Sequence, residues 1–373
     1  MRAMLIAACV AASSSCASPT TPPPPAEPVN GFLQIVEPVA NGIHVMRQAQ
    51  VNYAGVVGNV SIIEQTNGIV LVDSGSSYGD GARVVAAVRA LSRKPVTAVI
   101  ITHWHNDHPL GLAAIVEAWP GVSIIATEAT RVSLEGGRTN VPLQPDTAWE
   151  GRRRDQFQGY VTQLTPQTQD PALSQQEREG WARAISSLAI RERDVAGTHV
   201  VLPTRTFTES ITLEDRRTPI EIRFEGRANT DGDAIVWLPR QRILIAGDTI
   251  VWPIPYNFSM YPADNIATLQ RLRAYDYALL IPGHGEVQHD KGYLDLLIDF
   301  TTAAREAVGP LARNGATLEQ VTAQVRLESF APRFAGSDPW ALYWFENYAR
   351  APLIESAFNE ARGEPLGPPA LTP

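Results

Sequence analysis

Four side chains of metal-binding type lie within six residues, in the stretch Thr102-His103-Trp104-His105-Asn106-Asp107-His108. The stretch follows an apolar run at 96–101, of the kind expected for a buried strand, and precedes a predicted helix at 110–117. An open α/β sheet exposes functional side chains at the carboxyl ends of its strands. Two histidines at i and i+2 converge on one ion, while Asp107 and His108 turn toward a second point. We therefore predict a turn that serves two metal ions.

Five sequence signals, in chain order, resemble the metallo-β-lactamase superfamily. The His-x-His-x-Asp-His turn is the most specific of them, and the resemblance covers roughly residues 40–300. The other four are Leu71-Val72-Asp73-Ser74-Gly75, the stretch 226–239, Ala246-Gly247-Asp248-Thr249 and Pro282-Gly283-His284-Gly285.

The resemblance implies a site for two zinc ions. It assigns His103 and His105 to the first ion, and Asp107, His108 and His284 to the second, with the Asp248 carboxylate bridging both. Iron or manganese would fit the same ligands. Asp73 is a candidate acceptor that orients a ligand histidine, with a simple turn residue as the alternative.

One position departs from the family pattern. Where the family usually supplies a third histidine for the first ion, this chain reads Ala228-Asn229-Thr230-Asp231-Gly232-Asp233. An amide oxygen is a weaker zinc donor than an imidazole nitrogen. Three outcomes stay open: a dinuclear site with a weakened first ion, a single working zinc, or a metal-binding protein without hydrolytic activity. Asn229 would either bind the metal through its carbonyl oxygen or donate a hydrogen bond to a substrate oxygen. We expect the remaining histidines, His44, His199 and His289, at surface or packing positions. Of the three, His289 is the first candidate for a substitute ligand, because it lies five residues beyond His284.

A centre of this kind favours hydrolysis. Zinc lowers the pKa of bound water to about 7, so hydroxide would attack a lactam, lactone, ester or thioester carbonyl. Asp107 would orient the hydroxide, and we assign Asp107 and His284 as catalytic residues. A β-lactam is one possible small-molecule substrate, although Asp248 is typical of other hydrolase branches. The aromatic residues Trp104, Trp252 and Tyr256 are candidates for the substrate wall.

The composition narrows the function classes. With 39 acidic against 31 basic residues and a net charge of -8, the chain lacks the basic face that a nucleic-acid partner or a nuclease needs. A zinc-binding protein with a structural or sensing role is the alternative to an enzyme. The sequence leaves the oligomeric state open.

The first 17 residues resemble an export signal. Met1-Arg2 precedes a short apolar run and small residues, which predicts a periplasmic or secreted protein. We favour cleavage near 17 over a lipid anchor at Cys16, and the apolar run is too short to span a membrane. Cys9 and Cys16 are the only cysteines, so the metal ligands of the folded part are His, Asp or Asn. A proline-rich linker follows at 18–30.

The apolar pattern predicts a hydrolase domain over 31–310. Its two halves have similar content, so we expect a four-layer αββα sandwich. The predicted helices are 81–91, 110–117, 263–272 and 291–308. The predicted strands are 42–46, 57–63, 69–72, 96–101, 122–126, 199–202, 207–213, 220–224, 234–238, 243–246 and 277–281.

A polar segment at about 130–193 interrupts this rhythm. It contains one predicted helix, at 175–190, which starts in a capping box formed by Ser174 and Glu177. We interpret the segment as a helical insertion over one face of the fold, with a disordered linker as the alternative.

The C-terminal residues 311–373 are expected to form a helical extension. Asp338-Pro339 has the capping side chain and the first-turn proline of a helix start. Trp340, Trp344 and Tyr348 follow at helical spacing on one face. Rings of this size favour packing in the core or in a dimer interface over a ligand site.

Overall fold

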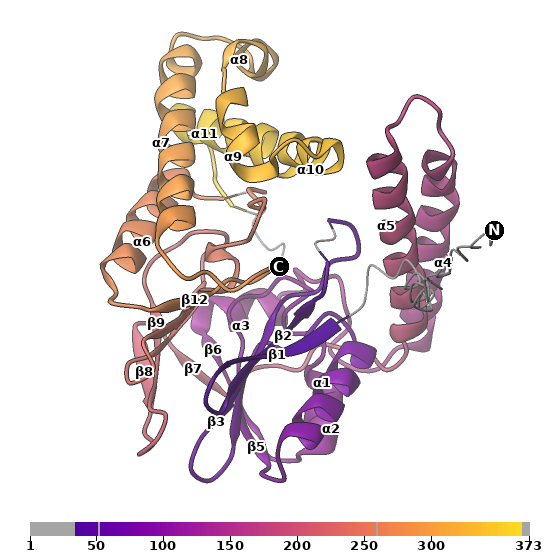
Figure 1. Ribbon diagram of the computed structural model, residues 1–373, viewed down its shortest axis with the longest axis vertical. Coiled ribbons are helices and arrows are strands. Elements are labelled where there is room, and N and C mark those ends of the chain that lie inside the picture. The colour runs from indigo at the N-terminus through magenta and orange to yellow at the C-terminus, as the bar shows by residue number, and fades with distance from the viewer. Residues whose placement is uncertain (1–33, 51–52, 259, 368–373) are drawn as a thin grey trace, which may run out of the picture.

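The protein is described by a computed structural model that covers residues 34–50, 53–258 and 260–367. The predicted export signal and proline-rich linker lie outside these residues. Two sheets form the centre of the fold (Figure 1). The larger has the order β1 to β7, with strands Gln34–Ala40, Ile43–Gln48, Val60–Glu64, Ile69–Val72, Val96–Ile100, Ser123–Thr127 and Arg205–Phe207. The smaller has the order β12-β11-β10-β9-β8, with β8 Ser210–Leu213, β9 Ile220–Phe224, β10 Ala234–Leu238, β11 Ile243–Ile245 and β12 Leu279–Ile281.

Alternating side chains in these strands build four layers. In β4, Val70 and Val72 pack between the sheets, while Ile69 and Leu71 pack against α1 (Tyr78–Leu91) and α2 (Leu112–Ala118). The smaller sheet repeats the pattern, because Leu244 packs toward α6 (Pro262–Ala274) and α7 (Gly292–Arg313). Successive strand residues point to opposite faces, so both sheets are covered on both sides. The predicted αββα sandwich is confirmed.

The polar segment after β6 is helical. It forms α3 (Glu128–Glu135), α4 (Thr147–Leu164), a short 3-10 turn (Thr165–Thr168) and α5 (Gln175–Asp194). The α4–α5 pair projects from the sandwich in Figure 1. The predicted capping box at Ser174 and Glu177 is present. The prediction of a single helix was wrong, because α4 buries only Glu150 and Phe157 and so carries almost no apolar periodicity.

The chain ends in a group of helices beside α7. They are α8 (Leu318–Gln324), a 3-10 turn (Glu328–Phe330), α9 (Ala331–Ala335), α10 (Pro339–Trp344), a π-helical stretch (Phe345–Arg350) and α11 (Ala351–Arg362). Asp338 caps α10 by accepting a hydrogen bond from the Trp340 amide. The predicted aromatic stripe packs inside the molecule, with Trp340 only 2% exposed and Trp344 stacked on Tyr53.

Two predicted strands differ from the structure. Residues 199–202 form no strand, because Val200 instead joins the insertion by donating its amide to Pro142 and packing with Leu134. The predicted strand 207–213 is two strands, β7 in the larger sheet and β8 in the smaller. The chain therefore crosses from one sheet to the other at 208–209. Within the described ranges, no helix is both long enough and apolar enough to cross a membrane.

Candidate metal centre

The candidate ligands lie where four buried strands end. The His-x-His-x-Asp-His turn follows β5, and Asp73 follows β4, its parallel neighbour. In the other sheet, Asp248 lies in a 3-10 turn (Gly247–Thr249) after β11, and His284 follows the parallel strand β12. Parallel strands bring their carboxyl ends to one edge of a sheet, so both sheets contribute to the same site.

The structure brings six predicted ligands together in two groups. His103, His105 and Asp248 form one group, and Asp107, His108 and His284 form the other, each with ligand atoms within 4.8 Å of one another. The Asp248 carboxylate reaches both groups. Its Oδ2 lies 3.7 Å from His103 Nε2, and its Oδ1 lies 3.2 Å from His108 Nε2 and 3.4 Å from His284 Nε2. This is the arrangement that a bridging ligand requires.

The donor set fits divalent metal ions. His108 Nε2, His284 Nε2 and Asp248 Oδ1 are buried, and among the described residues they have no hydrogen-bond partner of good geometry. Buried polar atoms without partners are uncommon in folded proteins, and a bound ion is one of their explanations. Imidazole and carboxylate are ligands that zinc, iron and manganese accept.

The charges at the site also suit a cation. Burial lowers the pKa of His103 and of His105, which leaves both imidazoles as neutral donors. Burial opposes a charged His284 as well, but the Asp248 and Asp107 carboxylates outweigh it and raise the pKa of His284 to about 9. Burial likewise opposes ionisation of Asp107, yet His108 and His284 hold its pKa below the usual range. Burial also opposes a charged His108, but Asp248, Asp73 and Asp107 outweigh it and raise the pKa of His108. Because neutral imidazole and ionised carboxylate are the forms that bind metal, an ion in the second group would displace a proton from the His108 ring and from the His284 ring.

Asp73 orients two parts of the turn. Its Oδ2 lies 2.8 Å from His108 Nδ1, and its two oxygens accept hydrogen bonds from the backbone amide and hydroxyl of Thr102. Because His108 Nδ1 faces Asp73, His108 Nε2 is directed toward the metal ligands. Such carboxylates fix the ring orientation of metal-binding histidines. Of the two roles considered for Asp73, the structure supports the orienting one.

Asn229 lies beside the first group. Its side-chain nitrogen is 3.3 Å from His105 Nδ1, so the amide is adjacent to the ligand atoms. The loop that holds it is fixed by Asp233, which accepts hydrogen bonds from the amides of Ala228 and Thr230. The Asn229 amide is thus fixed beside the first group of candidate ligands. His289 belongs to neither group of candidate ligands, and His44 lies within β2.

Two residues that support the centre were missed by the sequence reasoning. Gly58 packs on His108, because a Cβ there would come within 2.6 Å of the ring. Asn59 donates its side-chain NH₂ to the carbonyls of Pro282 and Gly285, on either side of His284. Neither carries a ligand atom, so only the close packing reveals them.

Aromatic residues surround the centre. Trp104 stacks edge-on against His105 with ring centroids 4.3 Å apart, which places it beside the first group. Tyr256 lies 5.2 Å from the His284 ring, and together with Trp252 it lines a small cavity next to His284. The three predicted substrate residues therefore all border the ligands.

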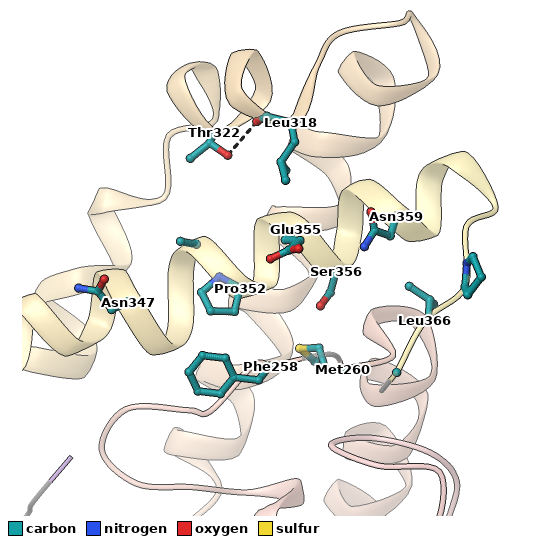
Figure 2. Close-up of a pocket in the computed structure, with 13 residues that line it drawn as sticks. Phe258, Met260, Leu318, Thr322, Asn347, Pro352, Glu355, Ser356, Asn359 and Leu366 are labelled. Carbon is teal, nitrogen blue, oxygen red and sulfur yellow. Dashed lines mark hydrogen bonds between the residues drawn. The ribbon is translucent and has the colours of Figure 1, made fainter. Parts of the chain in front are cut away.

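A larger cavity lies farther from the centre. It has a volume of about 360 Å³ and is formed by the loop after Asp248 together with α8 and α11. Figure 2 shows Phe258 and Met260 on one side of it and Pro352, Glu355 and Ser356 on the other. Contacting rings of Tyr348 and Tyr256 connect Phe258 to His284. These rings separate the cavity from the candidate ligands.

Known proteins resemble this chain in sequence and in fold. A linear primary-alkylsulfatase from Pseudomonas sp. (strain ATCC 19151) is 25% identical over 294 residues, 75% of this chain. The chain spans about half of that enzyme's length, 51%. The solved sec-alkylsulfatase Pisa1 from Pseudomonas sp. has a TM-score of 0.59 at 17% identity, covering 88% of this chain and 50% of that one.

Solved metallo-β-lactamases resemble it over a shorter part. The DIM-1 metallo-β-lactamase has a TM-score of 0.49 at 18% identity, covering 73% of this chain and 98% of that one. The family model described as the metallo-beta-lactamase superfamily matches residues 53–284, which include all the candidate ligands. This match covers more than half of the chain, and the protein therefore belongs to the metallo-β-lactamase superfamily.

Proposed function

We propose that this hydrolase uses two zinc ions, held by the two ligand groups, to cleave a small ester. The observation that carries the proposal is the Asp248 carboxylate, whose two oxygens face different ligand groups. When bound, a pair of zinc ions lowers the pKa of coordinated water to about 7 and stabilises negative charge that develops on the substrate.

The chain's own residues would position the reaction. Asp107 is the most exposed of the three carboxylates at the site, with 17% of its side chain accessible, so it can accept a hydrogen bond from the attacking water and orient it. Asp73 would keep the His108 ring fixed during this step. Trp104, Trp252 and Tyr256 would exclude bulk water and contact the apolar part of the substrate.

A sulfate ester is the substrate class that we favour. The support is the alkylsulfatase relative, whose similarity spans 75% of this chain. The carbonyl substrate predicted from the sequence, including a β-lactam, is the second candidate. The observation in its favour is the pair of rings, Trp252 and Tyr256, that lines the cavity beside His284. These apolar rings suit a neutral substrate as well as they suit a sulfate ester.

Two further parts of the proposal come from the sequence. The predicted export signal at 1–17 supports a location in the periplasm or outside the cell, and fractionation of cells that express the full chain would test this. A zinc-binding protein without hydrolytic activity is the competing function, motivated by Asn229 in place of histidine. If elemental analysis of the purified protein found iron or manganese, the proposal would name that metal in place of zinc.

The test combines metal content with turnover. The full chain would be analysed for metal per chain and assayed with dodecyl sulfate, a chromogenic β-lactam and a neutral aryl ester. We expect close to two zinc ions per chain and sulfate release, both reduced in His105→Ala. The matched control is His199→Ala, whose ring contacts the Gly197 carbonyl away from the centre. Full zinc loading without turnover of any substrate would contradict the enzyme and support the zinc-binding role.

A further inference from the structure

Two arginines of the helical insertion approach the metal-binding turn. Arg153 of α4 and Arg191 of α5 line one small cavity together with Asn106, which lies between the ligands His105 and Asp107. Ser76 and Ser77, which follow the Asp73 loop, complete its polar side. The cavity therefore lies between the insertion and the turn that carries the ligands.

Neither guanidinium is paired with an acidic side chain of the described residues. In the part of the chain that the structure describes, Arg191 has no hydrogen bond or ion pair, and its Nε is buried without a partner. Arg153 donates only to Gln156 and otherwise lies over the Phe157 ring. The Asn106 Oδ1 is also buried without a partner. The rest of the lining is mainly apolar and includes Leu110, Val141 and Phe157. Buried polar atoms that lack partners beside such a cavity are explained by a ligand or a water molecule.

The nearest carboxylates are engaged elsewhere. Asp80 and Asp194 both bind the guanidinium of Arg83, at 2.5 Å and 2.6 Å. They act on Arg191 only through space, as does Asp107, and burial still lowers the pKa of Arg191. Burial, and to a smaller extent the positive charge of Arg191, lowers the pKa of Arg153. Two like charges that lack bonded partners are stabilised by an anion between them.

We propose that Arg191 and Arg153 form a subsite for the negatively charged head group of the substrate, an oxyanion of the sulfate type. This inference rests on the proposed function, because the two arginines would bind the charged group of the same substrate that the metal centre cleaves. The cavity measures about 20 Å³, so it accepts one oxygen of the oxyanion while the rest of the group stays outside. Arginine is the side chain best suited to such groups, since its planar donors match two oxygens at once.

The subsite also explains how the insertion contributes to activity. The α4–α5 pair supplies no candidate metal ligand among the described residues. Its two arginines give the centre a preference for anionic over neutral esters, which the ligands alone do not provide. Removing one arginine should therefore change substrate choice while leaving metal binding intact.

Sulfate titration tests the subsite without relying on turnover. The full chain, freed of metal, would be titrated with sodium sulfate by calorimetry against sodium chloride of equal ionic strength. We expect Arg191→Gln to weaken sulfate binding roughly tenfold, the usual loss for one hydrogen bond to a charged group. Arg152→Gln and Arg193→Gln are matched controls, because these arginines are exposed on the same two helices. Two results would overturn the subsite. One is sulfate binding to the unmodified chain that is no stronger than chloride binding, and the other is a loss of sulfate affinity in the two control variants as large as the loss in Arg191→Gln.

A second measurement uses the zinc-loaded enzyme. Arg191→Gln should raise KM for dodecyl sulfate roughly tenfold and leave kcat/KM for the neutral aryl ester within about twofold. An equal loss on both substrates would indicate a structural role and overturn the proposal. If no substrate is turned over, the proposed function fails, and the titration still decides whether the arginines bind sulfate.

Discussion

The metal-binding turn and the α4–α5 pair lie next to each other, yet their geometry is fixed in different ways. The turn is held by backbone hydrogen bonds from three other segments, since Gly58 donates to Asp107, Ser74 to His108 and Ala234 to Thr102. The α4 helix buries only Glu150 and Phe157 and depends on α5 for its packing. The turn is part of the sandwich and is called the core region below, whereas the α4–α5 pair is attached to the sandwich and is called the attached region.

This difference separates two tasks of the molecule. Metal binding needs ligand positions fixed to fractions of an ångström, which strand ends in a packed core provide. Substrate choice tolerates variation, and helices outside the core supply it without disturbing the ligands. Changes in the core should therefore affect metal and turnover together, whereas changes in the helices should affect turnover or stability alone.

The largest effect is expected from Gly283→Ala. A Cβ at this position would collide with the Asp248 carboxylate and with the backbone of Gly247, so the bridging ligand must move. Turnover and metal content should fall together, the former by more than about a hundredfold, because even residues outside the ligand set change activity 10–100-fold. Elemental analysis and sulfate release measure both quantities.

The control for this substitution is Gly159→Ala in α4. A Cβ there meets nothing within 4 Å, so metal content and turnover should remain at the wild-type level. Full zinc loading in Gly283→Ala would show that the Asp248 position is not critical and would break the distinction between the two regions.

Asp73→Asn should have an intermediate effect. Asp73 has a left-handed backbone with φ of 64°, which asparagine tolerates, so the loop can keep its shape. The amide would remove the negative charge beside His108 Nδ1, and zinc affinity should fall about 10–100-fold. Competition with a chromophoric chelator measures the affinity. Asp170→Ala, in an exposed turn, is the control, and equal affinities in both variants would contradict the role of Asp73.

The sequence predicts the core region better than the attached one. Each metal ligand needs a particular donor atom at the end of a particular strand. The residue types and their spacing along the chain therefore predict the arrangement of the ligand groups directly. The sequence contains no comparable signal for Arg191, because its role depends on α5 packing beside Asn106. The α4 helix was missed for the same physical reason, since helix–helix contact stabilises it without an apolar stripe of its own.

Gly180→Ala tests the attached region. Gly180 lies on α5 directly against the Trp340 ring of α10, and an added Cβ would overlap that ring. Overpacking of this kind costs about 1–3 kcal/mol, so the free energy of unfolding should fall by that amount while zinc per chain stays constant. Denaturant unfolding and elemental analysis provide the two readouts. Gly151→Ala is the control, and a loss of zinc in Gly180→Ala would mean that the helices also hold the ligands in place.

The smallest effect is expected at Asp215, far from the ligands in the loop before β9. Burial opposes its ionisation, but hydrogen bonds from the amides of Thr218, Thr66 and Arg217 outweigh this and hold its pKa below the usual range. Because the folded-state pKa is depressed, the ionised form stabilises the fold above the unfolded pKa of about 4, and this contribution is lost as the pH falls. Asp215→Ala should cost about 1 kcal/mol at pH 7, and the difference from wild type should shrink below about pH 4. A difference that stays constant across this range in denaturant unfolding would show that the carboxylate charge is not what joins the Thr66 turn to the second sheet.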